Sequence, residues 1–442
     1  MIFRLRDFIF YPKAIYGFRR FLEESQYWAP EMRRGWVQER LERVLWHAVK
    51  NVPYYRKTLG PYESRFNAMV DNLDLRELPI LTKEEIRQNY HLLQAENAAQ
   101  FRPSETHTSG STGTPTAFLL DGGSNVTHFA SIWRVLNWSG YRFGNKFADL
   151  TGYVPRNGRL YQYDLRLNCI HLSSFNFKKE NIRTYVEKLK KFDPVLIKAY
   201  PSAIDLFCRW MKELDLNGYR PKAVLTCAET LLEHQRAAVQ EVLQCPVFDF
   251  YNQNERAALI STCENARYHV HEEYSYVEFL NPSESAQTAD SPKAIVATTL
   301  HNFAMPLIRY QTNDLATLGD QERCSCGRTY STVERIIGRV EDIVVTPDGR
   351  YVGRLDAAFK YSPGVRLSQV VQETVDEITV KVVKAASFRQ RDVETIEREL
   401  RTRLGDEIGI RFEYVDAILP GRNGKVKFVI SKPGKEALAT TS

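Results

Sequence analysis

The middle of the chain alternates amphipathic helical patterns with short apolar runs, and this alternation limits the folds open to it. Apolar residues at helical spacing predict a helix over 181–192, and a second helical pattern covers 231–243. The segments VLIKAY (195–200), AVLTCAE (223–229) and PVFDFYN (246–252) are typical of buried strands. Strands that alternate with helices favour parallel pairing in one sheet, because each helix carries the chain back across it. The sequence therefore predicts an α/β fold.

Further elements are expected on both sides of this layer. Upstream, an apolar face over 36–50 predicts an amphipathic helix, and Thr82 with Glu85 has the spacing of a helix capping box. Downstream, AIVATTL (294–300) and PLIRYQT (306–312) predict two more strands. The polar stretch 281–292 is expected to be a surface loop.

A change in pattern near GRVED (338–342) predicts a domain boundary. The last 100 residues or so combine an alternating strand pattern, EITVKVV (377–383), with one helix and a further strand. A chain of 442 residues is longer than a single core usually supports. We therefore expect a large N-terminal domain of layered sheets and helices over 1–340 and a small mobile α+β domain over 341–442. Two hinged bodies favour a site that opens and closes between them.

Composition excludes several classes of function. The chain has 60 basic and 54 acidic residues, so its net charge of +6 is mild and does not indicate nucleic-acid binding. No apolar run approaches about 18 residues, so no membrane span is expected. The basic, aromatic N-terminus lacks the cleavage pattern of a signal peptide and is expected to pack as a helix on its own domain; contact with a membrane surface is the alternative. Seven cysteines without a secretion signal favour a reducing cytoplasm over a disulfide framework.

The loop HTSGSTGTPT (107–116) has the composition of an anion-binding site. Its glycines let the backbone approach a ligand closely, and its hydroxyls and N–H groups are donors that suit a phosphate. The Walker pattern of a P-loop is absent from the chain. The alternative interpretation is a polar surface loop.

Four residues have the ligand types of a structural zinc site. A Cys-x-Cys pair with a distant cysteine and a histidine offers three thiolates and an imidazole, namely Cys263, His269, Cys324 and Cys326. His271 is the alternative histidine, and independent thiols are the alternative to a metal site. The other cysteines are expected in the core; these are Cys169, Cys208, Cys227 and Cys245.

Six motifs, in order along the chain, resemble those of the adenylate-forming enzymes. They are TSGSTGTP (108–115), LTCAETL (225–231), FYNQNE (250–255), RYQTNDLA (309–316), IIGRVEDIV (336–344) and GRNGKVKF (421–428). Within that superfamily the chain resembles the phenylacetate–CoA ligases and the CapK proteins of capsule biosynthesis. The segments that carry this likeness are 27–57, LPILTKEEIR (78–87) and the Cys-x-Cys-Gly-Arg run at 324–328.

The resemblance implies a cytoplasmic enzyme that activates a carboxylic acid with ATP and Mg²⁺. The acyl-adenylate forms with release of pyrophosphate, and the acyl group then passes to coenzyme A as a thioester or to an amine such as an amino sugar as an amide. The likeness to CapK proteins links the second outcome to surface polysaccharide biosynthesis. A non-catalytic nucleotide-binding scaffold is the alternative function. The sequence leaves a monomer and a homodimer open.

The same resemblance assigns the nucleotide contacts. Ala228 and Glu229 would line the nucleotide pocket, Tyr251 would lie near the adenine, and Asp314 would accept hydrogen bonds from the ribose hydroxyls. The β- and γ-phosphates would be held by Thr108, Ser109, Gly110, Ser111, Thr112 and Gly113. Asn252 and Asn254 complete the set, with Asn254 where the family has threonine.

The chain departs from the family pattern at two further positions. The lysine that usually follows the proline of the phosphate loop is absent, since Thr116 and Ala117 stand there. In the ribose motif Asn313 replaces the usual glycine, and asparagine tolerates left-handed backbone better than most residues.

Three residues are expected to be catalytic by resemblance. Lys425 of the small domain would stabilise the charge that develops during adenylation, with Lys427 as a nearby rival. Glu255 would bind Mg²⁺, and Arg339 would reach ribose or phosphate. The small domain would rotate about Glu341 or Asp342.

The acyl pocket is expected among Tyr153, Tyr200, Pro201 and residues 227–253, which include Asn252. Its aromatic lining would suit an apolar or aromatic acid.

Overall fold

The computed structural model describes most of the chain. The described residues are 12–107, 116–151, 153, 155, 159–172, 179–281, 292–320, 322–339, 344–347, 351–352, 355–359, 362, 364–419 and 427–433. The phosphate loop 108–113, the hinge pair Glu341 and Asp342, Lys425 and most of the 281–292 loop lie outside these residues, and only the backbone of Arg339 is described.

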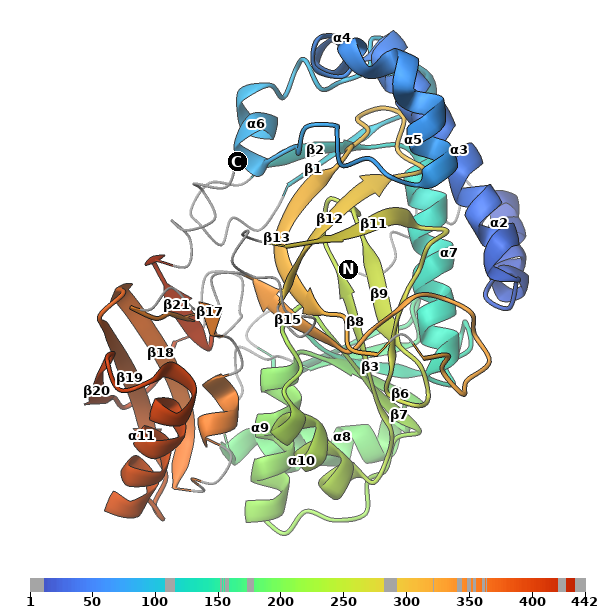
Figure 1. Cartoon of the computed structure of the whole chain (residues 1–442). Helices are drawn as coiled ribbons and strands as arrows, with labels where there is room; N and C mark the ends of the chain where they lie inside the picture. Colours follow the sequence, from blue (N-terminus) through green and yellow to red (C-terminus); the bar gives the residue numbers. More distant parts are fainter. Residues whose placement is uncertain are drawn as a thin grey trace.

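Helices dominate the N-terminal part. They are α2 (Pro12–Ser25), α3 (Pro30–Asn51), α4 (Pro53–Thr58), the 3₁₀ turn η1 (Gly60–Arg65), α5 (Phe66–Asn72), α6 (Lys83–Gln88) and the 3₁₀ turn η2 (Ala98–Phe101). The helix predicted at 36–50 is part of α3, and Thr82 and Glu85 form the predicted capping box at the start of α6. α2 buries Ile15 and Leu22, and its first turns pack against α7 (Gly122–Trp138) (Figure 1).

A nine-stranded mixed sheet forms the centre of the molecule. In spatial order its strands are β14 (Thr332–Val333), β10 (Tyr268–Val270), β9 (Leu259–Thr262), β8 (Val247–Asn252), β7 (Ala223–Cys227), β6 (Leu196–Ala199), β3 (Phe147–Leu150), β5 (Cys169–Leu172) and β4 (Tyr161–Asp164). The five strands from β8 to β5 are parallel to one another. The predicted α/β layer is thus confirmed.

The two faces of this sheet pack on different helices. α8 (Ile182–Phe192), α9 (Pro201–Glu213) and α10 (Glu233–Leu243) cover one face, with Ala148, Ile197 and Val224 in their shared core. α7 covers the other, where Phe147 and Leu196 are buried. The chain runs from β3 outward to β5, returns past β3 to β6 and continues to β8, so the strand order reverses between β3 and β6.

A second sheet carries the ribose motif. Its strands, all antiparallel, are β11 (Ser275–Leu280), β12 (Lys293–Thr299), β13 (Tyr310–Thr317) and β15 (Arg335–Arg339). β1 (Ser104–His107) and β2 (Ala117–Leu120) pair on either side of the predicted phosphate loop. The strand expected at 306–312 begins only at Tyr310, because Arg309 has a left-handed φ of 49° that a strand cannot include.

The C-terminal elements have a sheet and core of their own (red in Figure 1). They are β16 (Val344–Val345), β17 (Tyr351–Val352), the 3₁₀ turn η6 (Leu355–Phe359), β18 (Val365–Thr374), β19 (Glu377–Lys384), α11 (Gln390–Leu404), β20 (Gly409–Tyr414) and β21 (Val429–Ser431). Four of the strands form one sheet in the order β20-β19-β18-β21. Ile396 and Leu400 of α11 are buried in the same core as Val380 of β19. In the described part of the chain, no helix combines the length and apolarity needed to cross a bilayer.

Candidate functional site

The ribose-motif aspartate is held by a tyrosine from the neighbouring sheet. Tyr251, at the end of β8, donates its hydroxyl to Oδ2 of Asp314 on β13 at 2.6 Å. Burial and the adjacent carboxylate raise the pKa of Tyr251 well above its usual value, so the phenol stays a donor. Asn313, which precedes Asp314, has a left-handed φ of 62°. Asparagine tolerates this conformation, which explains how it can replace the glycine that is usual in the motif. Two residues assigned to the nucleotide are therefore in direct contact.

The glutamate assigned to Mg²⁺ has a similar support. Tyr310 on β13 donates its hydroxyl to Oε1 of Glu255 at 2.6 Å, and Glu255 is buried. Lys83, the first residue of α6, brings its ammonium within 3.7 Å of the same oxygen. Leu81 pairs with Tyr310, which places the start of α6 beside β13. Carboxylate oxygen is a preferred ligand of Mg²⁺, so this donor fits the ion.

The loop after β7 joins the nucleotide motifs to one another. Ala228 has a left-handed φ of 68°, so the chain turns sharply where the strand ends. Glu229 Oε2 accepts a hydrogen bond from the backbone N–H of Ser202 at the start of α9 (3.1 Å). Thr230 donates to the carbonyl of Ile337 on β15, the strand that ends at Arg339 (3.2 Å). Arg339 lies opposite Asp314 in the β13–β15 register.

The remaining predicted residues lie at the carboxyl ends of the parallel strands. Tyr200 and Pro201 join β6 to α9, and Pro201 takes the first helical position. Tyr153 follows β3 and stacks on His171 with ring centroids 4.0 Å apart. Asn252 is the last residue of β8, and Asn254 is exposed two residues later. The predicted acyl residues thus share one edge of the sheet.

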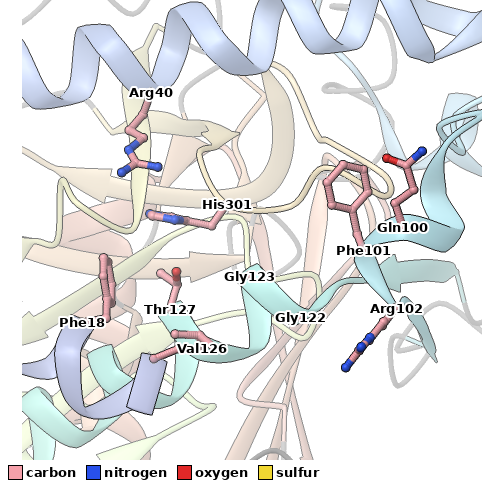
Figure 2. Close-up of a pocket in the computed structure, with 11 residues that line it drawn as sticks. Phe18, Arg40, Gln100, Phe101, Arg102, Gly122, Gly123, Val126, Thr127 and His301 are labelled. Atoms are coloured by element: carbon pink, nitrogen blue, oxygen red, sulfur yellow. The ribbon is translucent and has the colours of Figure 1, made fainter. Parts of the chain in front are cut away.

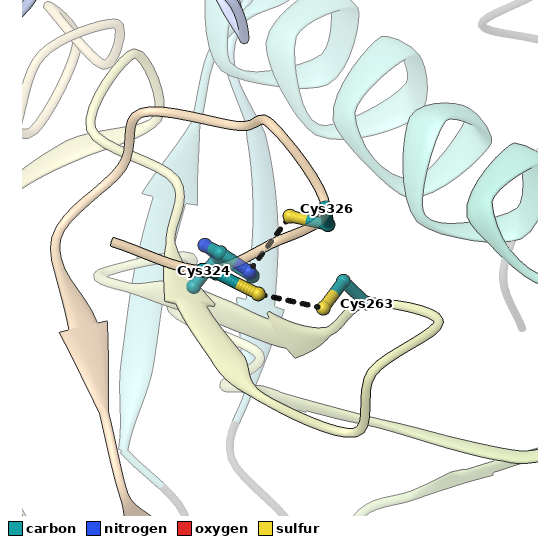
Figure 3. A group of neighbouring side chains, drawn as sticks. Cys263, Cys324 and Cys326 are labelled. Carbon is teal, nitrogen blue, oxygen red and sulfur yellow. Dashed lines mark hydrogen bonds between the residues drawn. The ribbon is translucent and has the colours of Figure 1, made fainter. Parts of the chain in front are cut away.

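The four predicted zinc ligands come together (Figure 3). Cys263 follows β9, His269 lies in β10, and Cys324 and Cys326 belong to the segment before β14; their ligand atoms all lie within 4.8 Å of one another. The Sγ atoms of Cys263 and Cys324 are 3.6 Å apart, and Nε2 of His269 is 3.5 Å from Sγ of Cys326. Burial and the nearby Arg328 lower the pKa of His269 to about 4, so the imidazole is neutral and free to ligate.

This geometry fits a tetrahedral metal ion. With zinc–sulfur bonds of about 2.3 Å, two thiolates at adjacent tetrahedral corners would be about 3.8 Å apart, close to the 3.6 Å between Cys263 and Cys324. Three thiolates and one imidazole fill all four positions, so the ion would be structural.

The alternative histidine has other partners. Nδ1 of His271 faces Arg134 on α7 at 2.5 Å, and Nε2 lies 2.7 Å from Oγ of Ser261. Because the guanidinium can only donate, Nδ1 accepts and Nε2 carries the proton toward Ser261. His269 is therefore the histidine of the cluster. The four cysteines outside it are buried, as predicted.

A separate cavity of about 540 Å³ lies at the start of α7 (Figure 2). It is lined by Phe18 of α2, Arg40 of α3, Gly123 of α7 and, from outside these helices, His301. His301 donates from Nε2 to the carbonyl of Glu273 at 2.7 Å, and burial lowers its pKa to about 4. None of the predicted nucleotide or acyl residues that the structure describes lines this cavity, so it is distinct from the candidate site.

Sequence reasoning missed several polar residues at these sites. Tyr310 and Lys83 support Glu255, although both lie in quoted segments, RYQTNDLA and LPILTKEEIR. Asp149, His171 and Lys198 form a buried charged group beside Tyr153. In the sequence, each of the three is a polar residue within a short strand. Such a residue does not indicate which strands become neighbours in the sheet.

Comparisons with known proteins agree with this architecture. Residues 344–432 match the family model of the CapK C-terminal domain. Protein CapK from Staphylococcus aureus is 23% identical over 403 residues, covering 89% of this chain and 88% of that protein. The phenylacetate-coenzyme A ligase of Thermus thermophilus is 27% identical over 398 residues, covering 84% and 86%.

A solved structure matches over nearly the whole length. The crystal structure of 2-hydroxyisobutyryl-CoA ligase in the postadenylation state aligns with a TM-score of 0.69 at 19% identity, covering 95% of each chain. This match confirms the predicted fold of a large α/β part followed by a smaller C-terminal domain. Together with the two sequence relatives, it confirms the identification as an adenylate-forming ligase. The chain is thus similar along most of its length to Protein CapK and to the phenylacetate–CoA ligases, as its motifs predicted, and residues 344–432 match the CapK C-terminal domain.

Proposed function

We propose that this protein activates a carboxylic acid with ATP and passes the acyl group to coenzyme A or to an amine. A carboxylate oxygen of the acid attacks the α-phosphorus of ATP, the bond from that phosphorus to the bridging oxygen breaks, and pyrophosphate leaves. Because both partners are anions, catalysis consists mainly of positioning and charge compensation.

The observation that carries the proposal is the pair of tyrosine-supported carboxylates. Asp314 and Glu255 each accept a hydrogen bond from a tyrosine hydroxyl at 2.6 Å, and the charges of both act on the Tyr310 hydroxyl, so they belong to one cluster. Asp314 would accept the ribose hydroxyls. Glu255 would hold Mg²⁺, which when bound offsets the charge of the phosphate oxygens.

The other roles rest on the motifs. The phosphate loop 108–113 would surround the β- and γ-phosphates with N–H and O–H donors, and Arg339 would reach ribose or phosphate. Lys425 would bring a point charge to the reacting phosphoryl group. Ala228, Glu229, Asn252 and Asn254 would line the nucleotide pocket.

For the second half-reaction, relatives named as coenzyme A ligases favour a thioester product. The likeness to Protein CapK supports an amine acceptor, such as an amino sugar of a surface polysaccharide.

The test is ATP–pyrophosphate exchange with a panel of carboxylic acids. We expect acid-dependent exchange in the wild type, at least about 100-fold less in Lys425→Ala, and near wild-type rates in the matched variant Lys427→Ala. Exchange that is absent with every acid would contradict the proposal and favour a nucleotide-binding scaffold. Unchanged exchange in Lys425→Ala would remove that lysine from the mechanism.

A further inference from the structure

A buried charged group lies where the strand order of the central sheet reverses. In the register of the parallel strands, Asp149 of β3 faces Lys198 of β6 on one side and His171 of β5 on the other. Side chains alternate along a strand, so all three point to the face of Phe147, Leu196 and Cys169, toward α7. In open α/β sheets, ligands bind outside the carboxyl ends of strands at such a reversal.

The acid of this group is fully engaged by its neighbours. Oδ2 of Asp149 lies 3.2 Å from Nδ1 of His171, and Oδ1 accepts the Thr151 hydroxyl at 2.6 Å. Against the effect of burial, the charge of Lys198 and these hydrogen bonds hold the pKa of Asp149 at about 2. Asp149 is therefore a carboxylate that orients the imidazole of His171.

The ammonium of Lys198, unlike the carboxylate of Asp149, lacks a close hydrogen-bond partner among the described residues. This ammonium lies 3.7 Å from Oδ1 of Asp149, beyond hydrogen-bond distance, and the lysine side chain is only 8% exposed. Among the described residues, no hydrogen bond from this ammonium to a protein acceptor is formed. An ammonium carries three donors, and those that the protein leaves unused here are open to water or to a ligand. The arrangement is that of a donor kept for a ligand.

The ligand this donor would meet is the acyl group. Tyr153, which stacks on His171, and Tyr200, two residues after Lys198, are the residues expected to line the acyl pocket. The charge of Lys198 acts on the Tyr200 hydroxyl, so the two side chains are neighbours. An apolar acid would leave the ammonium without a partner, whereas an oxygen acceptor on the acid would satisfy it.

We infer that the acid activated by this protein carries an oxygen hydrogen-bond acceptor on its acyl group, such as a hydroxyl or an amide carbonyl, which Lys198 binds. This inference rests on the proposed function and adds an oxygen acceptor to the apolar or aromatic acid that the sequence suggested. Asp149 acts as a positioning residue, since it orients His171 and holds the ammonium at the pocket. A pocket built to hydrogen-bond a group discriminates strongly against the analogue that lacks it.

The test measures exchange with matched pairs of acids: 3-hydroxybutanoate with butanoate, N-acetylglycine with pentanoate, and 4-hydroxyphenylacetate with phenylacetate. In the wild type we expect kcat/KM to be about 10- to 100-fold higher for the oxygen-bearing acid of at least one pair. Lys198→Met should raise KM for that acid by the same factor while kcat/KM for its apolar partner stays within about threefold. The matched control is Lys212→Met, an exposed lysine on α9 paired with Glu241.

A second variant guards against misfolding. Lys198→Met leaves Asp149 buried without its cation, so the double variant Asp149→Asn/Lys198→Met, which removes both charges, is measured beside it. Loss of the preference in either folded variant supports the inference. A wild type that prefers the apolar acid in every pair, or a variant in which all acids lose activity equally, overturns it while the proposed function stands. A wild type that exchanges with no acid overturns the proposed function and this inference with it.

Discussion

The Cys–His cluster lies on the central sheet, whereas the carboxylates Asp314 and Glu255, proposed to serve the nucleotide, lie where the central sheet meets the second sheet, and the two groups are built differently. In the Cys–His cluster each of the four side chains offers one ligand atom, and these four atoms lie within 4.8 Å of one another. In the nucleotide region each functional acid has a tyrosine partner: Tyr251 holds Asp314 and Tyr310 holds Glu255. The first arrangement would close around a single ion, whereas the second would orient acids for a ligand that arrives later.

This difference separates stability from activity. If the cluster holds an ion, removing one ligand weakens binding of that ion. The free energy of unfolding then falls, because metal binding contributes to folding. Replacing a ligand-binding carboxylate by an amide lowers the affinity for the ligand. The neighbouring tyrosine hydroxyl keeps its hydrogen-bond partner, because the amide oxygen still accepts. The predictions below test this separation.

The largest effect is expected from Cys324→Ser. The variant should lose stoichiometric zinc and at least about 3 kcal/mol of its free energy of unfolding, because the metal contributes to folding directly. Metal analysis and denaturant unfolding measure both quantities. The control is Cys208→Ala, which changes a buried cysteine of α9 outside the cluster and should leave the zinc content unchanged. A Cys324→Ser protein with unchanged metal content and stability would show that the cluster is only a group of thiols.

Asp314→Asn should give the opposite profile. The amide still accepts from Tyr251 but loses the charge-assisted bonds to the ribose, so KM for ATP should rise about 10- to 100-fold with little change in unfolding free energy. Asp249 offers a matched buried pair, since it accepts the Tyr268 hydroxyl at 2.7 Å and is not itself assigned to the nucleotide, although its other oxygen accepts the Thr226 hydroxyl. Asp249→Asn should destabilise the protein and leave KM for ATP unchanged. Equal effects of the two substitutions on KM would contradict the assigned role of Asp314.

The sequence predicted the parts of the fold that local patterns decide. α8, β6, α9, β7, α10 and β8 follow each other by short connections, and helical periods or short apolar runs identify most of them directly. The strand was predicted to start too early, since Arg309 has a left-handed φ; its guanidinium bonds to Glu278, 31 residues away, at 3.0 Å from both Nε and Nη2. Such a contact leaves no trace in the local pattern.

The sites show the same limit. The residue types of the Cys–His cluster named the four residues that come together, but the pattern also offered His271, which directly follows β10 two residues after His269. Arg134, from α7, decides between them by occupying Nδ1 of His271. Lys198 and Asp149 become neighbours only through the order of the strands, which no motif records.

The pH at which stability is compared also matters, because the pKa of His301 differs between the folded and the unfolded protein. Burial lowers its pKa to about 4 from an ordinary 6.5. Between these values the unfolded chain binds a proton that the folded protein does not, so stability falls as the pH falls from 6.5 to 4. We expect this one residue to contribute a loss of about 2 kcal/mol.

His301→Gln keeps a donor toward the carbonyl of Glu273 and removes the titration. Denaturant unfolding at several pH values should therefore give a shallower decline for this variant than for the wild type. An identical slope would show that His301 protonates freely in the folded protein. Stability differences between the two sites are best read above pH 6.5, where this contribution is constant.

The smallest effect comes from the tyrosines themselves, and it sharpens the comparison most. Tyr251→Phe removes one hydroxyl that orients Asp314, and Tyr268→Phe removes the equivalent hydroxyl from Asp249. Each should cost about 1 kcal/mol of unfolding free energy, since each breaks one buried hydrogen bond. Tyr251→Phe should in addition raise KM for ATP several-fold, because a carboxylate that rotates freely is oriented less well for the ribose, whereas Tyr268→Phe should not. If both variants lower stability alone, the Tyr251 hydroxyl serves the fold and Asp314 needs no partner to bind its ligand.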